Sequence, residues 1–150
     1  MSATVVQLAI SRGGVPKHAI LAAEVTRAGL AGDVQKHTRF HGGPDRALCL
    51  FSLEVIERLR AEGHPVAPGS TGENVTIRGV PWAQLDTGAR LALGATVVVE
   101  ITGLTDPCKQ IAGSFVDRQF RRILLRGDSR LYARVLAEGT LRPGDRVVVL

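Results

Sequence analysis

The stretch Thr96-Val-Val-Val-Glu-Ile-Thr-Gly103-Leu-Thr-Asp-Pro107-Cys108-Lys109-Gln-Ile111 combines a strand pattern with a reactive side chain. Its first half is rich in β-branched residues, which is typical of a β-strand. Gly103 is expected to end this strand, and Pro107 stiffens the backbone directly before Cys108. Lys109 favours the thiolate form of its neighbour, and the thiolate attacks electrophiles and binds metals. A buried structural cysteine is the alternative, and this stretch alone does not choose between the two.

The same strand predicts a mainly β fold when it is combined with its surroundings. It forms the second arm of an expected hairpin, with Arg90–Leu93 as the first arm and Gly94-Ala95 as the turn. The apolar run Ala47–Phe51 predicts a buried strand, and Cys49 within it is interpreted as a core residue. Further short strands are expected at Val5–Ile10, near Val75–Ile77, near Leu131–Val135 and at Arg146–Leu150.

Two helices are expected between these strands. Ser52 is a candidate N-cap, and apolar residues follow it at helical spacing up to Gly63. Ser114 with Asp117 resembles a capping box, and Gly127 ends the second pattern. Many short strands, glycine turns and a few helices indicate an α+β, β-barrel-like single domain over residues 1–150. The apolar face of the second helix would consist of Val116, Phe120, Ile123 and Leu124.

The amino-acid composition favours a folded domain and argues against nucleic-acid and membrane partners. The chain has 150 residues, 45% of them hydrophobic and 22% charged, which suits one folded domain. The formal net charge of +5 suits a small anionic ligand, whereas an aromatic content of 4% argues against nucleic acid as a partner. No apolar run has the length of a bilayer span, and the N-terminus lacks a signal-peptide pattern. We therefore expect a cytoplasmic protein with reduced cysteines and no membrane partner.

The densest polar cluster of the sequence lies between Asp33 and Arg46. The double glycine and the proline in this cluster favour a loop, and cationic side chains with glycine backbone N–H groups favour an anion-binding loop. A zinc site formed by two histidines and an aspartate would need a helix for its i, i+4 spacing. A solvated basic loop is a third interpretation. The other polar residues of the cluster are Lys36, His37, Arg39, His41 and Asp45.

A second polar turn, Pro68–Ile77, contains Glu73 and Asn74. Their side chains either hold a polar ligand or tie the loop to its neighbours, and the spacing is compatible with both.

Taken in order, several stretches resemble the MOSC domain, a family named after the C-terminal part of molybdenum-cofactor sulfurase. The resemblance is greatest to its small stand-alone bacterial members and covers nearly the whole chain. The C-terminal Tyr132–Val135 and Pro143–Asp145 also fit. The four main stretches are Gly29-Leu-Ala-Gly-Asp33, His41-Gly-Gly-Pro-Asp-Arg-Ala47, Gly72-Glu-Asn-Val-Thr76 and Gly103-Leu-Thr-Asp-Pro-Cys108.

The resemblance implies a role connected with the molybdenum cofactor (molybdopterin). Cys108 matches the cysteine that is thought to carry a persulfide or to ligate molybdenum. Such a protein would be a sulfur transferase or a molybdenum-dependent reductase of N-hydroxylated compounds, supplied by a sulfur donor or an external electron-donor protein. The implied pocket residues are Asp33, His41, Asp45, Glu73 and Asn74, and Lys36, Arg39, Arg46 and Lys109 are candidate anion-binding cations.

One position departs from the family pattern. The family often has arginine three residues before its cysteine, where this chain has Thr105. Lys109, Arg39 and Arg46 are the candidate replacements for the missing cation. The alternative function is a non-catalytic module that binds an anion or a partner, and such a module would not need the Cys108 thiol.

Overall fold

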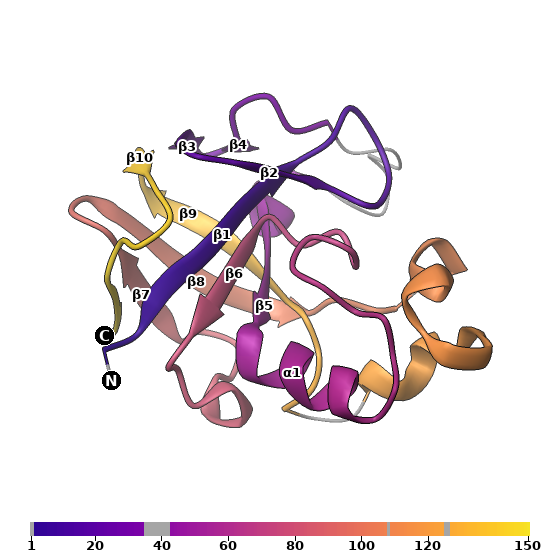
Figure 1. Ribbon diagram of the computed structural model, residues 1–150. Helices are drawn as coiled ribbons and strands as arrows, with labels where there is room; N and C mark the ends of the chain where they lie inside the picture. Colours follow the sequence, from indigo (N-terminus) through magenta and orange to yellow (C-terminus); the bar gives the residue numbers. More distant parts are fainter. Residues whose placement is uncertain (1, 35–42, 108, 125–126) are drawn as a thin grey trace.

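The computed structural model describes residues 2–34, 43–107, 109–124 and 127–150, and it is built mainly from β-strands (Figure 1). One sheet has eight strands in the order β11-β7-β8-β9-β5-β6-β1-β2, and a second sheet has three in the order β10-β3-β4. In the large sheet β5 and β6 pair in parallel, and the other described pairs are antiparallel. The strands of the large sheet are β1 (Thr4–Ile10), β2 (His18–Ile20), β5 (Leu48–Ser52), β6 (Val75–Arg78), β7 (Arg90–Leu93), β8 (Val97–Leu104), β9 (Leu131–Ala137) and β11 (Val147–Val149).

The small sheet consists of β3 (Ala23–Thr26), β4 (Gly29–Leu30) and β10 (Gly139–Leu141). Strand β10 was not expected from the sequence, because the C-terminal region predicted two strands and not three. The mainly β, α+β fold class is confirmed.

The strands of the large sheet in the described part of the chain do not pair into a closed ring. Its order ends at β11 on one side and at β2 on the other. The beginning of β1 nevertheless approaches β11 through a single bridge between Thr4 and Arg146. Close to it, the Val5 N–H donates to the Asp145 carbonyl oxygen at 2.8 Å. The two ends of the described chain meet here, where the Val147 N–H donates to the Ala3 carbonyl oxygen at 2.9 Å (Figure 1).

Helix α1 (Leu53–Ala61) forms where the sequence predicted it. The Ser52 hydroxyl accepts a hydrogen bond from the Val55 N–H at 3.2 Å, which confirms Ser52 as the N-cap. The helix buries Val55, Ile56 and Leu59 in the hydrophobic core. The same core contains Leu48, Leu50 and Phe51 of β5. Two short 3₁₀ helices, η1 (Pro44–Arg46) and η2 (Trp82–Gln84), complete this half of the chain.

The prediction of a second α-helix, after Ser114, is wrong. Its region forms three 3₁₀ segments, η3 (Lys109–Ser114), η4 (Val116–Arg118) and η5 (Phe120–Leu124). Asp117 and Arg118 have φ values of 51° and 57°, in the left-handed region that an α-helix does not allow. The predicted capping box of Ser114 is absent among the described hydrogen bonds, since η4 has Phe115 at its N-cap, and the Ser114 hydroxyl donates to the Ser70 carbonyl oxygen at 3.4 Å.

The predicted end of the hairpin strand also needs correction. Strand β8 continues through Gly103 to Leu104, with a register shift against β9 between Ile101 and Gly103. The glycine therefore marks an irregularity in the ladder and not the end of the strand. No helix within the described part of the chain has the length and apolar character needed to cross a membrane.

Candidate functional site

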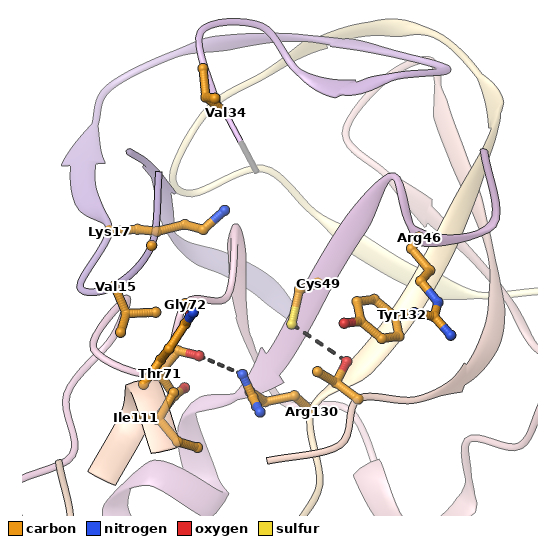
Figure 2. A pocket seen from close by; sticks show the side chains of 13 residues that line it. Val15, Lys17, Val34, Arg46, Cys49, Thr71, Gly72, Ile111, Arg130 and Tyr132 are labelled. Atoms are coloured by element: carbon orange, nitrogen blue, oxygen red, sulfur yellow. Dashed lines mark hydrogen bonds between the residues drawn. The ribbon is translucent and has the colours of Figure 1, made fainter. Parts of the chain in front are cut away.

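A small pocket forms where segments from across the chain meet beside β5 and β9 (Figure 2). Strand β5 contributes Cys49, and β9 contributes Tyr132 with Arg130 directly before it. The segment after β8 contributes Thr105, and the segment before β6 contributes Thr71 and Gly72. The remaining described lining residues are Gly14, Val15, Lys17, Val34, Arg46, Gln110 and Ile111.

Cys49 is buried, as predicted, but its thiol also faces the pocket. The residue is 8% exposed, and its Sγ lies 3.6 Å from Thr105 Oγ1. Burial raises the pKa of the Cys49 thiol, whereas the charge of Arg130 and the contact with Thr105 lower it. Since burial is the largest effect, the thiol is held protonated at neutral pH.

Arg130 is the cation that sequence reasoning missed. It is 5% exposed, and its guanidinium donates to the Thr71 carbonyl oxygen at 2.5 Å and to the Asp106 carbonyl oxygen at 3.2 Å. Its own carbonyl oxygen accepts from the Thr105 N–H at 2.9 Å. Arg130 therefore lies against the segment in which Thr105 replaces the family's arginine. From the departure at Thr105, Arg130 was not predicted, and the candidate replacements were Lys109, Arg39 and Arg46.

Arg46 and Tyr132 form another part of the pocket lining. The guanidinium carbon of Arg46 lies 5.2 Å from the centroid of the Tyr132 ring, a cation–π distance. Burial raises the pKa of the Tyr132 phenol to about 12, so the phenol stays neutral. Of the cations predicted for the site, Arg46 is the one that the described residues place in the pocket lining.

Asp33 and Asn74 form a buried polar network behind the pocket. The Asp33 carboxylate accepts from Lys17 Nζ at 2.6 Å, from Asn74 Nδ2 at 2.8 Å and from the Ser11 N–H at 2.9 Å. The Lys17 and Asp33 side chains are 6% and 4% exposed. Asn74 Oδ1 also accepts from the Cys49 N–H at 3.1 Å. These two predicted site residues therefore position Lys17 and Cys49, which line the pocket.

Three other predicted residues are not among the described residues that line the pocket. Glu73 is buried and accepts from the hydroxyls of Thr71 at 2.9 Å and Thr76 at 3.3 Å, and burial raises the pKa of its carboxyl group. Asp45 is exposed and forms an ion pair with Arg134 Nη2 at 3.2 Å. Lys109 is exposed at the start of η3.

Four predicted residues, Lys36, Arg39, His41 and Cys108, lie outside the described residues. His37 of the zinc hypothesis lies there as well. Thr105 and Gln110, on either side of position 108, both line the pocket. Within the described ranges, no group of three or more histidine, cysteine, aspartate or glutamate residues is arranged to hold a metal ion.

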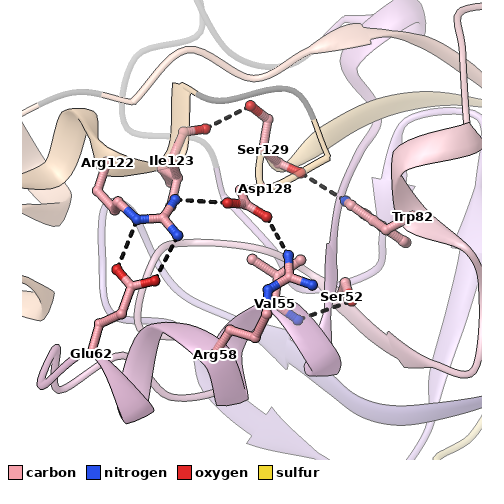
Figure 3. Close-up of polar contacts among 9 residues, drawn as sticks. All are labelled: Ser52, Val55, Arg58, Glu62, Trp82, Arg122, Ile123, Asp128 and Ser129. Carbon is pink, nitrogen blue, oxygen red and sulfur yellow. Dashed lines mark hydrogen bonds and ion pairs between the residues drawn. The ribbon is translucent and has the colours of Figure 1, made fainter.

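An ionic cluster connects the segment after position 108 to helix α1 (Figure 3). Arg122 donates to both carboxylate oxygens of Glu62, at 2.8 and 2.7 Å, and to Asp128 at 2.7 Å. Arg58 of α1 forms an ion pair with the same Asp128. Such two-oxygen contacts fix geometry as well as charge, so the cluster holds η5 against α1.

Comparison with known proteins places this architecture in a family. The MOSC domain model matches residues 37–148. An uncharacterized protein of Bacillus subtilis, YflK, is 29% identical over 143 residues, which are 94% of this chain. This chain spans 64% of the length of that curated relative.

Solved structures share the fold at low sequence identity. YUAD from Bacillus subtilis superposes with a TM-score of 0.80 at 20% identity, covering 98% of this chain and 94% of that chain. YiiM from Geobacillus stearothermophilus has a TM-score of 0.75 at 22% identity, covering 99% and 75%. YiiM from Escherichia coli has a TM-score of 0.72 at 21% identity, covering 100% and 70%. With the family match over most of its length, the chain belongs to the MOSC domain family, whose members are associated with enzymes of the molybdenum cofactor.

Proposed function

We propose that this protein is a molybdenum-cofactor-associated sulfur carrier or cofactor-binding protein whose reactive group is the Cys108 thiol. The observation that carries the proposal is the position of Thr105 and Gln110. These residues flank position 108 in the sequence, and both line the pocket that contains Cys49 and Arg130. Cys108 belongs in sequence to a stretch whose residues on either side line the pocket, and this supports its assignment as the reactive group.

In the carrier role, Cys108 would exchange sulfur without any net redox change. The Cys108 thiolate attacks the terminal sulfur of a donor persulfide, and a new S–S bond forms while the donor's S–S bond breaks. The donor leaves as a thiolate with the bonding electron pair, and Cys108 becomes a persulfide. An acceptor nucleophile then takes the terminal sulfur, and the Cys108 thiolate is released. A sulfur-donor protein is the partner that this cycle requires.

The described residues also fit an anionic pterin cofactor. The pocket lining contains the cations Lys17, Arg46 and Arg130, and such side chains bind phosphate groups by charge-assisted hydrogen bonds. When bound, the molybdenum centre would supply reduction of N-hydroxylated compounds, with electrons from an external donor protein. In this version the Cys108 sulfur would be a soft ligand for the metal. Arg130 and Arg46 would hold the phosphate, and the buried wall around Cys49 would limit access of water.

The amount of bound cofactor and the formation of a cysteine persulfide can be measured on the same protein preparations. Wild type, Cys108→Ser and Cys49→Ser are purified from a cofactor-replete host, and bound molybdenum and pterin are quantified. Separately, each protein is treated with polysulfide, and the gain of one sulfur atom is mapped by peptide mass spectrometry. Cys49→Ser is the matched control, since its thiol lies in the pocket lining and is held protonated by burial.

The two versions of the proposal predict different results. Cofactor that is present in wild type and Cys49→Ser but absent in Cys108→Ser supports metal ligation by Cys108. Persulfide on Cys108, with no bound cofactor, supports the carrier role. Equal cofactor content in all three proteins, together with no persulfide on Cys108, would refute both versions and favour the non-catalytic binding module.

A further inference from the structure

We propose that the pocket is a binding seat for a small oxyanion of the phosphate or sulfate class, held by Arg130 beside the Cys49 thiol. This inference rests on the proposed function and deepens it, because it assigns the anion to Arg130 in the same pocket, but its test requires neither the Cys108 thiol nor molybdenum. It rests on the burial of Arg130, on the hydrogen-bonding capacity of its guanidinium and on the charges of the pocket lining.

Arg130 is a buried cation that lacks an ion-pair partner in the described part of the chain. It is 5% exposed, yet none of the ion pairs among the described residues includes it. A buried charge is costly unless a counter-charge and hydrogen bonds compensate it. Glu73 interacts with Arg130 through its charge, but its carboxylate oxygens accept from Thr71 and Thr76. The guanidinium therefore has neutral carbonyl oxygens where a direct counter-ion would be expected.

The guanidinium also has hydrogen-bonding capacity beyond its protein contacts. It carries five N–H donors, and the contacts to Thr71 and Asp106 each use one nitrogen at its outer end. Each of these two nitrogens has a second hydrogen, and Nε has no partner among the described residues. A planar guanidinium with spare N–H groups matches the oxygens of phosphate and sulfate. These spare donors identify the end of Arg130 that a bound oxyanion would contact.

The charges of the other residues that line the pocket are compatible with a bound anion. Its described members include Lys17, Arg46 and Arg130 and no aspartate or glutamate. The Lys17 charge is balanced by Asp33, so Arg130 is the lining cation that supplies the excess positive charge for the oxyanion. Burial keeps the Cys49 thiol and the Tyr132 phenol neutral by raising the pKa of each, so neither group repels an anion. The oxyanion would thus enter a lining of net positive charge.

Thermal unfolding at constant ionic strength provides the test. Wild-type protein is titrated with inorganic phosphate or sulfate, and sodium chloride replaces the salt in the reference samples because chloride screens surface charge equally. At ten times Kd we expect a saturable rise in Tm of about 3–5 °C for a chain of this size. Glycerol phosphate in a parallel series shows whether the seat takes free ions alone or also the terminal phosphate of a larger molecule.

Three variants locate the seat. Arg130→Met is expected to weaken phosphate and sulfate binding at least about tenfold, as a charged hydrogen-bond partner is lost. Arg130→Lys retains the charge and should bind with intermediate affinity. Arg121→Gln removes an exposed arginine of η5 and should bind as the wild type does.

A second measurement does not depend on how well Arg130→Met folds. Phosphate or sulfate in the seat should slow alkylation of wild-type Cys49, read at its own peptide by mass spectrometry and compared with sodium chloride. A wild-type protein that shows neither a Tm rise beyond chloride nor this protection would overturn the proposal. So would an Arg130→Met protein with the full Tm rise. Neither result bears on Cys108, so failure of this inference is distinguishable from failure of the proposed function.

Discussion

The buried ion pair between Lys17 and Asp33 offers the sharpest test of how the pocket is built. Lys17 Nζ lies 2.6 Å from Asp33 Oδ2, and the two side chains are 6% and 4% exposed. Asp33→Asn keeps the size of the side chain but removes the charge, and Lys17 is left as a buried cation. Breaking a buried pair in this way costs about 3–5 kcal/mol of unfolding free energy. For 150 residues this corresponds to a fall in Tm of about 6–20 °C.

Urea unfolding followed by circular dichroism measures the loss directly. The matched control is Arg90→Gln, which breaks the pair between Arg90 Nε and Glu100 at 2.9 Å, where the side chains are 57% and 19% exposed. An exposed pair contributes at most about 1 kcal/mol, so the control should stay close to wild type. The double variant Lys17→Met/Asp33→Leu removes both charges and should recover part of the loss. An Asp33→Asn protein as stable as the Arg90→Gln protein would refute the assignment of this pair as a structural support of the pocket.

Three further predictions concern the stability of the elements around the pocket. Ser52→Ala removes the N-cap of α1 and should lower the unfolding free energy by about 1 kcal/mol in urea titrations. A Gly144→Ala substitution, at φ 93° and with open space for the new methyl group, should cost about 1–2 kcal/mol from backbone strain alone. Gly29→Ala should cost clearly more in the same titration, because its Cβ would lie 2.4 Å from the Ala47 carbonyl oxygen at φ 118°; equal losses would contradict the close approach of β4 to residue 47. Arg122 lowers the pKa of Glu62 from its ordinary 4.5 through their hydrogen bonds, so this stabilising contribution is present above pH 4.5 and is lost as the pH falls through the lowered value. Urea midpoints of wild type and Arg122→Gln should therefore converge in acid, and a constant difference between them would argue against the ionic cluster as its source.

The strands were predictable where hydrophobic pattern and turn chemistry agree. The run from Leu48 to Phe51 is apolar at every position, and the structure buries the whole of β5. The hairpin of β7 and β8 follows from the β-branched residues of β8 and from the turn at Gly94, which has a φ of 65°. These signals are local, so a single sequence contains them.

The helix predicted after Ser114 failed because spacing does not determine backbone conformation. Val116, Phe120, Ile123 and Leu124 repeat at helical intervals, but Val116 and Leu124 are exposed. The left-handed conformation of Asp117 interrupts the chain between them. Tertiary contacts such as the Arg122–Glu62 pair then decide the path of this segment, and no local pattern encodes them.

The sequence predicted which segments lie near the candidate site better than it predicted what their individual side chains contact. Asp33 and Asn74 were expected near a ligand, and they form hydrogen bonds to the lining residues Lys17 and Cys49 without lining the pocket themselves. Cys49 was expected in the core, and it is buried, yet it also faces the pocket. Whether a buried side chain meets a neighbouring residue or a cavity depends on segments distant in the sequence.

Arg130 explains how the pocket keeps a cation although Thr105 stands where the family often has arginine. Arg130 precedes β9, which pairs with β8, and this pairing brings its guanidinium to the Asp106 carbonyl oxygen. Thr105 is small enough to be buried there, and its hydroxyl meets the Cys49 thiol. The effect of a positive charge on a bound anion depends on the distance between them and on burial. It does not depend on which strand or loop carries the charge. The departure at Thr105 therefore does not remove the electrostatic condition for binding an anion, because the neighbouring strand supplies the charge at the same segment.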